Sequence, residues 1–278
     1  MVSKADLQGY QDFSRILLKA KDYLYVLPHS LLRPYVANYT ITYPDGNQIS
    51  ENYTVIPNGS STLVFSFDGN EIYAGLFGAA TKINQVGEQA NKRKVLFIIE
   101  FYPHGLYPFL KEDQSEMKDC LLPFESVDRM LHREIYQAFE QAADVYALLS
   151  QVDQILLACM QNSFMKSELI LAMDRIITEG GRLTVKELAD SVYYSERHLN
   201  RIFRQFVGVN VKTLLKLVRV NKAIRYLQAN RGSITKTAYE AGYYDEAHFI
   251  NEFKSICHIT PQSYMKNMSD FYNEIAKF

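Results

Sequence analysis

The stretch SERHLNRIF, residues 195–203, and the stretch DEAHFINEF, residues 245–253, repeat one pattern in the last third of the chain. In both copies a residue that can cap a helix comes first, a His stands three positions later and a Phe closes the stretch. Each copy follows a short helical segment and a tight connection, and two such units in tandem are typical of paired helix-turn-helix motifs. The pattern therefore predicts a function that resides in an exposed surface rather than in a pocket of catalytic groups.

Capping signals mark where the helices around the first copy begin. Thr184 and Glu187 have the spacing of a capping box, and Ser195 is a favourable N-cap residue. Apolar residues at helical spacing predict further helices over residues 166–179 and 211–229. The last third of the chain is therefore expected to be an all-α domain.

The net charge of −1 conceals an uneven distribution. Residues 1–181 carry 15 basic and 22 acidic side chains, whereas residues 182–266 carry 14 basic and 7 acidic ones. Because the basic part coincides with the repeat, it is the candidate surface for a polyanion such as nucleic acid.

Length and composition exclude several classes of protein. A chain of 278 residues with 47% hydrophobic and 22% charged residues is typical of a globular protein of about two domains. Charges interrupt the N-terminus, and no run of 18 apolar residues occurs, so we expect a cytoplasmic protein without a signal peptide or membrane span. The three cysteines have neither metal-ligand nor disulfide spacing; they are Cys120, Cys159 and Cys257. We predict no bound metal and no cofactor.

The first part of the chain has the pattern of short strands. Residues 35–43, 61–67, 71–78 and 94–103 are rich in aromatic and β-branched residues, and Asp68-Gly69 indicates a hairpin. These segments predict a small antiparallel barrel or sandwich. The expected fold is therefore an α+β arrangement of two domains.

Residues 130–162 contain almost no Gly or Pro and have a broad apolar face at helical spacing. Two interpretations stay open: these helices pack against the barrel, or they form the seam of a homodimer. We expect a β-rich domain over residues 1–130, a helical connector over 131–163 and a DNA-binding domain over 164–278. The main apolar stripe consists of Val145, Leu148, Val152, Ile155 and Cys159.

Residues 166–265 resemble the AraC/XylS-type bacterial transcription regulators. The matching residues of the first unit and the helix after it are Leu188, Ala189, Ser195, Leu199, Arg201, Phe203, Gly208, Arg219, Ala223 and Leu227. Those of the second unit are Ala238, Gly242, Tyr243, Asp245, Phe249, Phe253, Lys254, Thr260, Pro261 and Tyr264. The resemblance implies a tandem helix-turn-helix domain that binds double-stranded promoter DNA and acts with RNA polymerase.

Three positions depart from the pattern of this family. His258 stands where Gly is usual, and Asn251 and Met265 stand where Arg is common. We therefore expect the second reading helix to end differently, and the second unit to bind DNA more weakly or to read another base.

The N-terminal part resembles one subgroup of the sensor domains attached to this family, through residues 33–40, 55–67 and 101–107. This resemblance implies a cupin-like barrel that receives a small-molecule effector. His104 stands alone, without the closely spaced His pair of a cupin metal site, so no metal is expected there. The chain could act as a monomer or as a homodimer.

In the first unit, helical spacing turns a set of polar side chains toward the DNA. Arg matches the paired acceptors of guanine and Asn the acceptor–donor pair of adenine. The resemblance to the family implies that Arg197, Asn200 and Arg201 contact bases. Arg204 is expected to bind phosphate, and His198 to face the groove. The residues expected to face the core are Leu199, Ile202, Phe203 and Phe206.

The second unit offers a different set of candidate contacts. Glu246 can accept from a cytosine amino group, Ala247 can touch a thymine methyl, and Asn251 can read adenine. Lys254 is a phosphate candidate, and His248 matches His198 in the repeat. The alternative is that these residues make only shape and phosphate contacts.

Two other classes of function are weighed against a regulator that responds to an effector. In one, the N-terminal domain binds only a protein partner, because its barrel is filled by Phe65, Phe67, Phe97 and Phe101. In the other, the chain is an enzyme with an accessory DNA-binding domain. The common nucleophile, metalloprotease, P-loop and dinucleotide motifs are missing from the sequence, so a protein that is not an enzyme is predicted.

Overall fold

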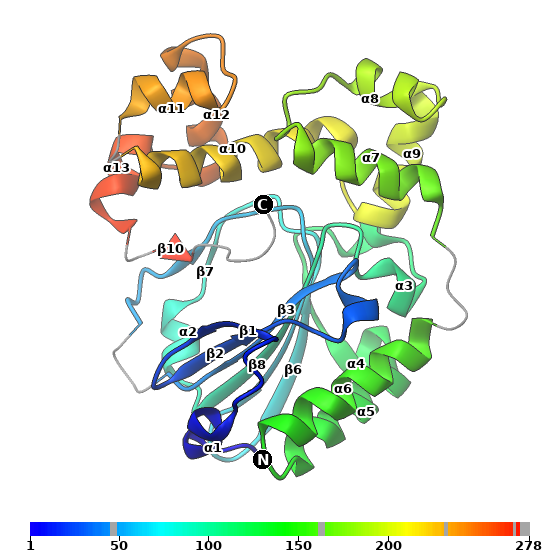
Figure 1. The fold of residues 1–278 in the computed structure, drawn as a ribbon, viewed down its shortest axis with the longest axis vertical. Coiled ribbons are helices and arrows are strands. Elements are labelled where there is room, and N and C mark those ends of the chain that lie inside the picture. The colour runs from blue at the N-terminus through cyan, green and yellow to red at the C-terminus, as the bar shows by residue number, and fades with distance from the viewer. Residues whose placement is uncertain (45–48, 161–164, 231–232, 269–270, 273–278) are drawn as a thin grey trace.

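The structure is a computed structural model of residues 1–278 and describes all of them except 45–48, 161–164, 231–232, 269–270 and 273–278. A β-rich N-terminal domain lies below a group of C-terminal helices (Figure 1). This arrangement confirms the expected α+β organisation. The expected boundary between residues 163 and 164 lies outside the described residues. The three predicted domain ranges therefore stay a prediction.

Seven strands form one antiparallel sheet in the order β1-β2-β3-β8-β5-β6-β9. They are β1 (Ile16–Lys19), β2 (Tyr23–Val26), β3 (Val36–Thr42), β5 (Thr62–Phe67), β6 (Ile72–Phe77), β8 (Val95–Phe101) and β9 (Leu121–Pro123). A second sheet, in the order β10-β4-β7, contains β4 (Thr54–Val55), β7 (Asn84–Gln85) and β10 (Phe271–Tyr272). Within the described ranges β1 and β9 are the edges of the large sheet, so the expected barrel is not closed.

The smaller elements of the N-terminal domain are helices and 3₁₀ turns that connect these strands. They are α1 (Lys4–Gly9), η1 (Ser30–Leu32), α2 (Gly87–Asn91), α3 (Tyr107–Leu110), η2 (Gln114–Met117) and α4 (Phe124–Val127). The predicted hairpin at Asp68-Gly69 is present, because β5 and β6 pair in antiparallel register across it.

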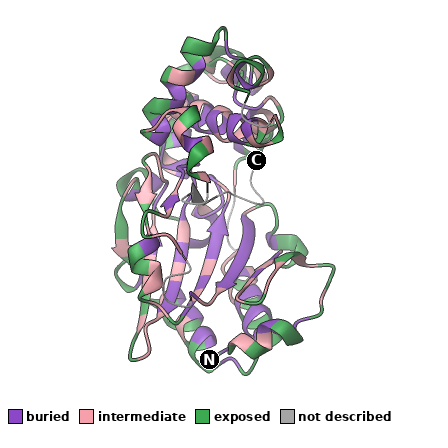
Figure 2. Cartoon of the chain, turned by 90° about the vertical axis from the view of Figure 1, so that its left-hand side faces the viewer, coloured by how far each residue is buried: buried purple, intermediate pink, exposed green. Residues whose placement is uncertain are grey.

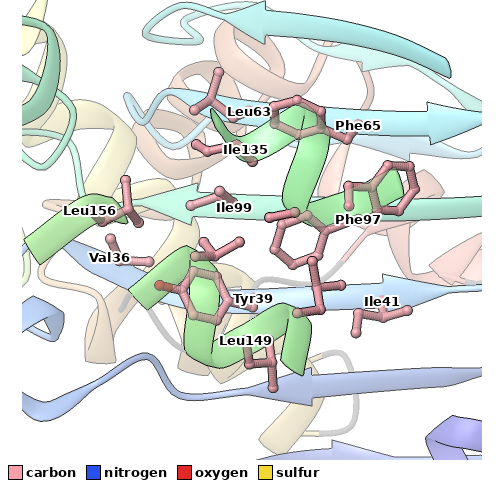
Figure 3. Packing of buried hydrophobic residues seen from close by; sticks show 14 of the residues in the cluster. Val36, Tyr39, Ile41, Leu63, Phe65, Phe97, Ile99, Ile135, Leu149 and Leu156 are labelled. Atoms are coloured by element: carbon pink, nitrogen blue, oxygen red, sulfur yellow. The ribbon is translucent and has the colours of Figure 1, made fainter. Parts of the chain in front are cut away.

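One face of the large sheet is apolar and packs against two helices, α5 (Arg129–Gln141) and α6 (Val145–Met160). Figure 3 shows Phe65 and Phe97 of the strands among side chains of these helices. Their rings lie 6.3 and 6.1 Å from the ring of Phe139 in α5. Phe65, Phe97 and Phe101 therefore pack on the helix-covered face and do not fill a barrel interior.

Helix α6 is also held to the sheet by a buried carboxylate. Asp153 accepts a hydrogen bond from the Tyr39 hydroxyl at 2.8 Å and pairs with Arg15 at 2.8 Å. Val145, Leu148 and Val152 of the predicted apolar stripe are buried in the same core. These residues of the stripe thus pack against the sheet of the same chain. A dimer formed through these helices stays a prediction.

The opposite face of the sheet carries one row of polar residues at the end of three strands. Asn38, Glu100 and Thr62 are paired in register across β3, β8 and β5, so they form one row on that face. Asn38 and Glu100 are both buried. Figure 2 shows the central strands as largely buried, which agrees with cover on both faces.

Seven helices follow in the described part of the chain. They are α7 (Ser167–Thr178), α8 (Val185–Ser191), α9 (Glu196–Val207), α10 (Val211–Ala229), α11 (Ile234–Glu240), α12 (Glu246–Cys257) and α13 (Pro261–Lys266). Two of them, α7 and α10, match the predicted ranges 166–179 and 211–229 closely. The capping box is present, since Thr184 accepts from the Glu187 amide at 3.1 Å and the Glu187 carboxylate accepts from the Thr184 amide at 2.8 Å.

Helix α10 joins the two helix-turn-helix units. Leu214 and Val218 belong to the apolar core of the first unit, formed with α7, α8 and α9. Leu217 and Ile224 belong to the core of the second unit, formed with α11, α12 and α13. Because one straight helix supplies both cores, it fixes how the two units are placed relative to each other.

The N-terminal domain contacts these helices directly. The carbonyl of Pro57 accepts a hydrogen bond from the Asn221 side chain in α10 at 2.9 Å. Ile56 packs in the core of the second unit, and Ala79 and Tyr107 pack in or against that of the first. The strand pair β10 and β4 adds a backbone connection from the last helices to the N-terminal domain.

Candidate nucleic-acid interface

Helix α9 has a well-defined beginning and end. The Ser195 hydroxyl accepts from the His198 amide at 3.2 Å, and Gly208 ends the helix in the left-handed conformation at φ 84°. A Cβ at Gly208 would lie 2.9 Å from the Ala79 Cβ, so both the backbone and the space favour glycine there. The residues predicted to face inward are all buried: Leu199, Ile202, Phe203 and Phe206.

The opposite side of α9 carries a line of exposed basic residues. Arg197, Arg201 and Arg204 are exposed and lie at i, i+4 and i+7, which places them on one face of the helix. His198 lies at the edge of this face, half-buried, with the Tyr194 ring edge-on at 4.5 Å. An Arg201 guanidinium nitrogen lies 3.4 Å from the His198 Nδ1 atom. The structure therefore brings together four of the five predicted contacts of this unit.

Asn200 is placed differently from the other four. Its Oδ1 atom accepts from the Val211 amide at the start of α10 at 3.2 Å, and its Nδ2 atom donates to the Glu196 carbonyl at 2.9 Å. Both ends of the amide are thus used within the domain. Reading adenine would require Asn200 to break these bonds.

Helix α12 repeats the plan of α9. Asp245 accepts from the His248 amide at 2.7 Å, and His258 ends the helix in the left-handed conformation at φ 58°. The expectation that His258 changes the end of this helix is wrong, because the backbone turns as it does at Gly208. A residue with a Cβ adopts this conformation at a cost of about 1–2 kcal/mol.

The exposed face of α12 has the same spacing but a different chemistry. Ala247, Asn251 and Lys254 are exposed at i, i+4 and i+7. Glu246 is exposed and accepts a hydrogen bond from the Thr235 hydroxyl at 2.7 Å. His248 is exposed and meets the Tyr243 ring at 5.2 Å, as His198 meets Tyr194. This face offers one basic side chain where α9 offers three.

A partly buried ion pair, which the sequence reasoning missed, fixes α12 against α10. The Arg219 Nε atom lies 2.9 Å from the Glu252 carboxylate, and its guanidinium lies 5.3 Å from the Tyr243 ring. Burial raises the pKa of the Tyr243 phenol well above its usual value. The signal in the sequence was an acidic residue at an inward helical position, between Phe249 and Phe253.

Two further findings concern other kinds of site. Among the described residues, no three His, Cys, Asp or Glu side chains gather as metal ligands would. None of the helices described is both long and apolar enough to span a bilayer.

Comparison with known families agrees with this geometry. Residues 188–267 match the model of a helix-turn-helix domain, and residues 25–123 match a domain of unknown function. The first match covers both reading helices and the helix between them. The C-terminal region therefore contains a helix-turn-helix domain. We call it the AraC-type domain, because its sequence resembles the AraC/XylS-type regulators. It follows a separate N-terminal domain.

Two curated relatives each match a limited part of the chain. An HTH-type transcriptional regulator of Haemophilus influenzae is 33% identical over 85 residues, which are 31% of this chain and 28% of that protein. The HTH-type transcriptional regulator GlxA of Rhizobium meliloti is 39% identical over 69 residues, 25% of this chain and 21% of that protein. The chain thus spans about a quarter of the length of these curated relatives.

Two solved structures that resemble parts of the chain come from Vibrio cholerae and Geobacillus stearothermophilus. ToxT from Vibrio cholerae has 14% identity over 82% of this chain and 97% of that chain, with a TM-score of 0.41. The C-terminal domain of AraT, a response regulator from Geobacillus stearothermophilus, has 24% identity over 37% of this chain and 88% of that chain, with a TM-score of 0.35.

Proposed function

We propose that the chain is a sequence-specific DNA-binding transcription regulator of the cytoplasm, which reads two successive major grooves of promoter DNA. The observation that carries this proposal is the pair of matching exposed faces on α9 and α12, both fixed to α10. A helix of this kind lies in the major groove with its outer residues toward the base edges. Two such helices on one connecting helix suit grooves about 34 Å apart.

The two faces predict unequal contributions to binding. Arg197 and Arg201 carry the donors that match guanine, and Arg204, one turn further along α9, suits a phosphate. On α12, Asn251 matches adenine and Ala247 a thymine methyl, while Lys254 suits a phosphate. Because basic groups supply most of the salt-dependent affinity, the first unit should supply the larger electrostatic share.

Paired substitutions on α9 test this assignment. The probes are a duplex enriched by the wild-type protein from a randomised pool and a mixed-sequence duplex of the same length. Arg201→Ala should weaken binding to the enriched duplex by about 1–3 kcal/mol and relax one base preference. Arg204→Ala should weaken binding to both duplexes and lower the salt slope by about 1. Arg133→Ala, an exposed residue of α5, is the matched control and should change neither.

Different outcomes would contradict the proposed function and the proposed roles of single residues. If Arg201→Ala binds both duplexes as the wild type does, the docking of α9 in the groove is wrong. If the wild-type protein enriches no sequence at all, the proposal of a sequence-specific regulator fails.

The N-terminal domain is proposed to sense a small-molecule effector and to pass its state to the AraC-type domain. A ligand would favour one arrangement of the helices at residues 130–162, and so set the spacing between two DNA-binding domains in a homodimer that recruits RNA polymerase. Two features support a coupling of this kind: the contacts of Ile56, Pro57 and Tyr107 with the AraC-type domain, and the buried polar row at Asn38 and Glu100.

One atom of the polar row favours this proposal over a purely protein-binding domain. Asn38 donates to the Thr40 hydroxyl at 3.0 Å, but its buried Oδ1 atom has no partner among the described residues. A buried acceptor without a partner costs free energy, which a ligand that donates a hydrogen bond would offset. A ligand that shifts the melting temperature should also change operator affinity or the preferred spacing between half-sites. A ligand that leaves both of these and transcription unchanged contradicts the sensing role.

A further inference from the structure

Three tyrosines of the AraC-type domain are the most exposed large hydrophobic residues that the structure describes. Tyr193 is 96% exposed, Tyr244 is 94% exposed and Tyr239 is 85% exposed. Tyr193 and Tyr244 lie in the turns that lead into the two reading helices, and Tyr239 lies in the last turn of α11. An aromatic ring fully in water contributes nothing to the core, so folding alone does not explain these positions.

The two turns share an arrangement that separates an inner tyrosine from an outer one. The inner residues, Tyr194 and Tyr243, each pack edge-on against the His in the first turn of the reading helix. The outer residues, Tyr193 and Tyr244, project into solvent. Tyr193 does so from the left-handed backbone region, at φ 57°, which is unfavourable for a residue with a Cβ.

We propose that Tyr193 and Tyr244 are DNA-backbone contacts, one at the entrance of each reading helix. This inference rests on the proposed function of the AraC-type domain. The phenol hydroxyl would donate to a phosphate oxygen, and the ring would cover the adjacent deoxyribose. Tyr193 stands two residues before the N-cap Ser195, and Tyr244 stands immediately before the N-cap Asp245.

Continuity with the candidate interface identifies DNA as the occupant of this surface. The N-terminal part of a reading helix contacts the base edges, so the turn before it lies beside the phosphates that flank the groove. The exposed Arg197 lies two residues after Ser195, in the first turn of α9. Tyrosine is among the side chains that hydrogen-bond to phosphates and fix the register of a protein on the duplex.

The chemistry of tyrosine distinguishes these contacts from the basic ones. A neutral hydroxyl donates a hydrogen bond to a phosphate without displacing a counterion, so its removal should not change the salt dependence of binding. A phosphate contact carries no sequence information, so its loss should weaken binding to every duplex alike. Loss of Arg204 should lower the salt slope by about 1, which gives a direct comparison.

The variants Tyr193→Phe and Tyr244→Phe remove only the hydroxyls and test the proposal. The probes are the duplex enriched from a randomised pool and a mixed-sequence duplex, each titrated at two salt concentrations. Each variant should lose about 3- to 10-fold in affinity for both duplexes, as for a lost hydrogen bond, with an unchanged salt slope and an unchanged melting temperature. Tyr73→Phe, at an exposed position in β6, is the control and should bind as the wild type does.

Protection from iodination provides a second measurement that does not depend on substitution. Excess enriched duplex should protect Tyr193 and Tyr244 of the wild-type protein, mapped by mass spectrometry, and leave Tyr73 reactive. If the wild type binds the duplex while both variants bind equally well and both rings stay reactive, the tyrosine proposal is wrong and the proposed function stands. If the wild type enriches and binds no duplex, the proposed function itself fails.

Discussion

The ring of Tyr107 in the N-terminal domain lies against the ring of Phe206 at the end of the reading helix α9, with 4.2 Å between their centroids. Tyr107 is the first residue of α3, close behind the central strand β8. Two residues beyond Phe206, Gly208 approaches Ala79 and Gln114 of the same domain. The end of the first reading helix therefore rests directly on the proposed sensor.

Removing this ring should loosen the contact between the domains. Tyr107→Ala should lower the free energy of unfolding by about 1–2 kcal/mol, because a half-buried aromatic surface is lost. Urea denaturation measures the change. Tyr239→Ala removes an exposed ring and should stay within about 0.5 kcal/mol of the wild type. Equal stability of the two variants would show that the contact of Tyr107 with Phe206 contributes nothing.

The ends of the two reading helices predict substitution effects of opposite sign. Gly208→Ala should destabilise the protein by about 2 kcal/mol or more, from the left-handed backbone and the close approach of Ala79 and Gln114. His258→Gly should stabilise it by up to about 1 kcal/mol, because relief of a similar backbone cost exceeds the added freedom of the unfolded chain. Thermal unfolding of both variants checks this, and a destabilised His258→Gly would contradict it.

The ion pair of Arg219 with Glu252 predicts a loss that a second substitution reverses. Arg219→Met leaves the buried Glu252 carboxylate without its partner and should cost about 3 kcal/mol of stability. The double variant Arg219→Met, Glu252→Met removes both charges and should recover most of that loss. Denaturant titration of the single and double variants measures the coupling. Additive losses would mean that the two residues act independently.

Burial of His104 predicts a dependence of stability on pH. Burial lowers the pKa of His104 to about 4, from its ordinary value of 6.5, so the folded protein keeps this side chain neutral. The unfolded chain binds a proton below pH 6.5, so stability should fall as the pH drops from 6.5 to 4, by about 3 kcal/mol at most. His104→Gln should flatten this part of the profile. An identical profile for the variant would assign the effect to other groups.

The elements that follow local rules could be predicted from the sequence. The capping box at Thr184, the N-cap at Ser195 and the helix of residues 211–229 all depend on residues close together in the chain. Strands β3, β5, β6 and β8 also followed their apolar and β-branched patterns, whereas β1, β2 and β9 were not predicted. Local patterns did not show which element each surface would pack against.

The choice between a barrel and a sandwich stayed open in the sequence, because it depends on contacts between residues far apart in the chain. Alternation shows that a strand has two faces, but it does not show which face meets a helix. Phe65 and Phe97 looked suited to a barrel interior, whereas they pack on α5 because Phe139 lies there. The bond of Tyr39 to Asp153 joins residues 114 positions apart, beyond the reach of any local pattern.

The sequence predicted which residues of the candidate interface are exposed better than it predicted what each of them contacts. Helical spacing placed Arg197, Arg201 and Arg204 on one exposed face. It also placed Asn200 outward, where the structure bonds that amide to the start of α10. The exposure of Tyr193 depends on a left-handed backbone that no sequence rule for tyrosine predicts.

Genome-wide occupancy in the native host, followed by titration of the recovered sites at two salt concentrations, tests the central claim most directly. The account predicts discrete sites that share a motif of two blocks, about one helical turn apart, bound at least about 10³-fold more tightly than mixed-sequence DNA. Diffuse occupancy without a motif, with steeply salt-dependent binding of any duplex, would contradict it. The basic half of the chain would then be an electrostatic anchor rather than a reader of sequence.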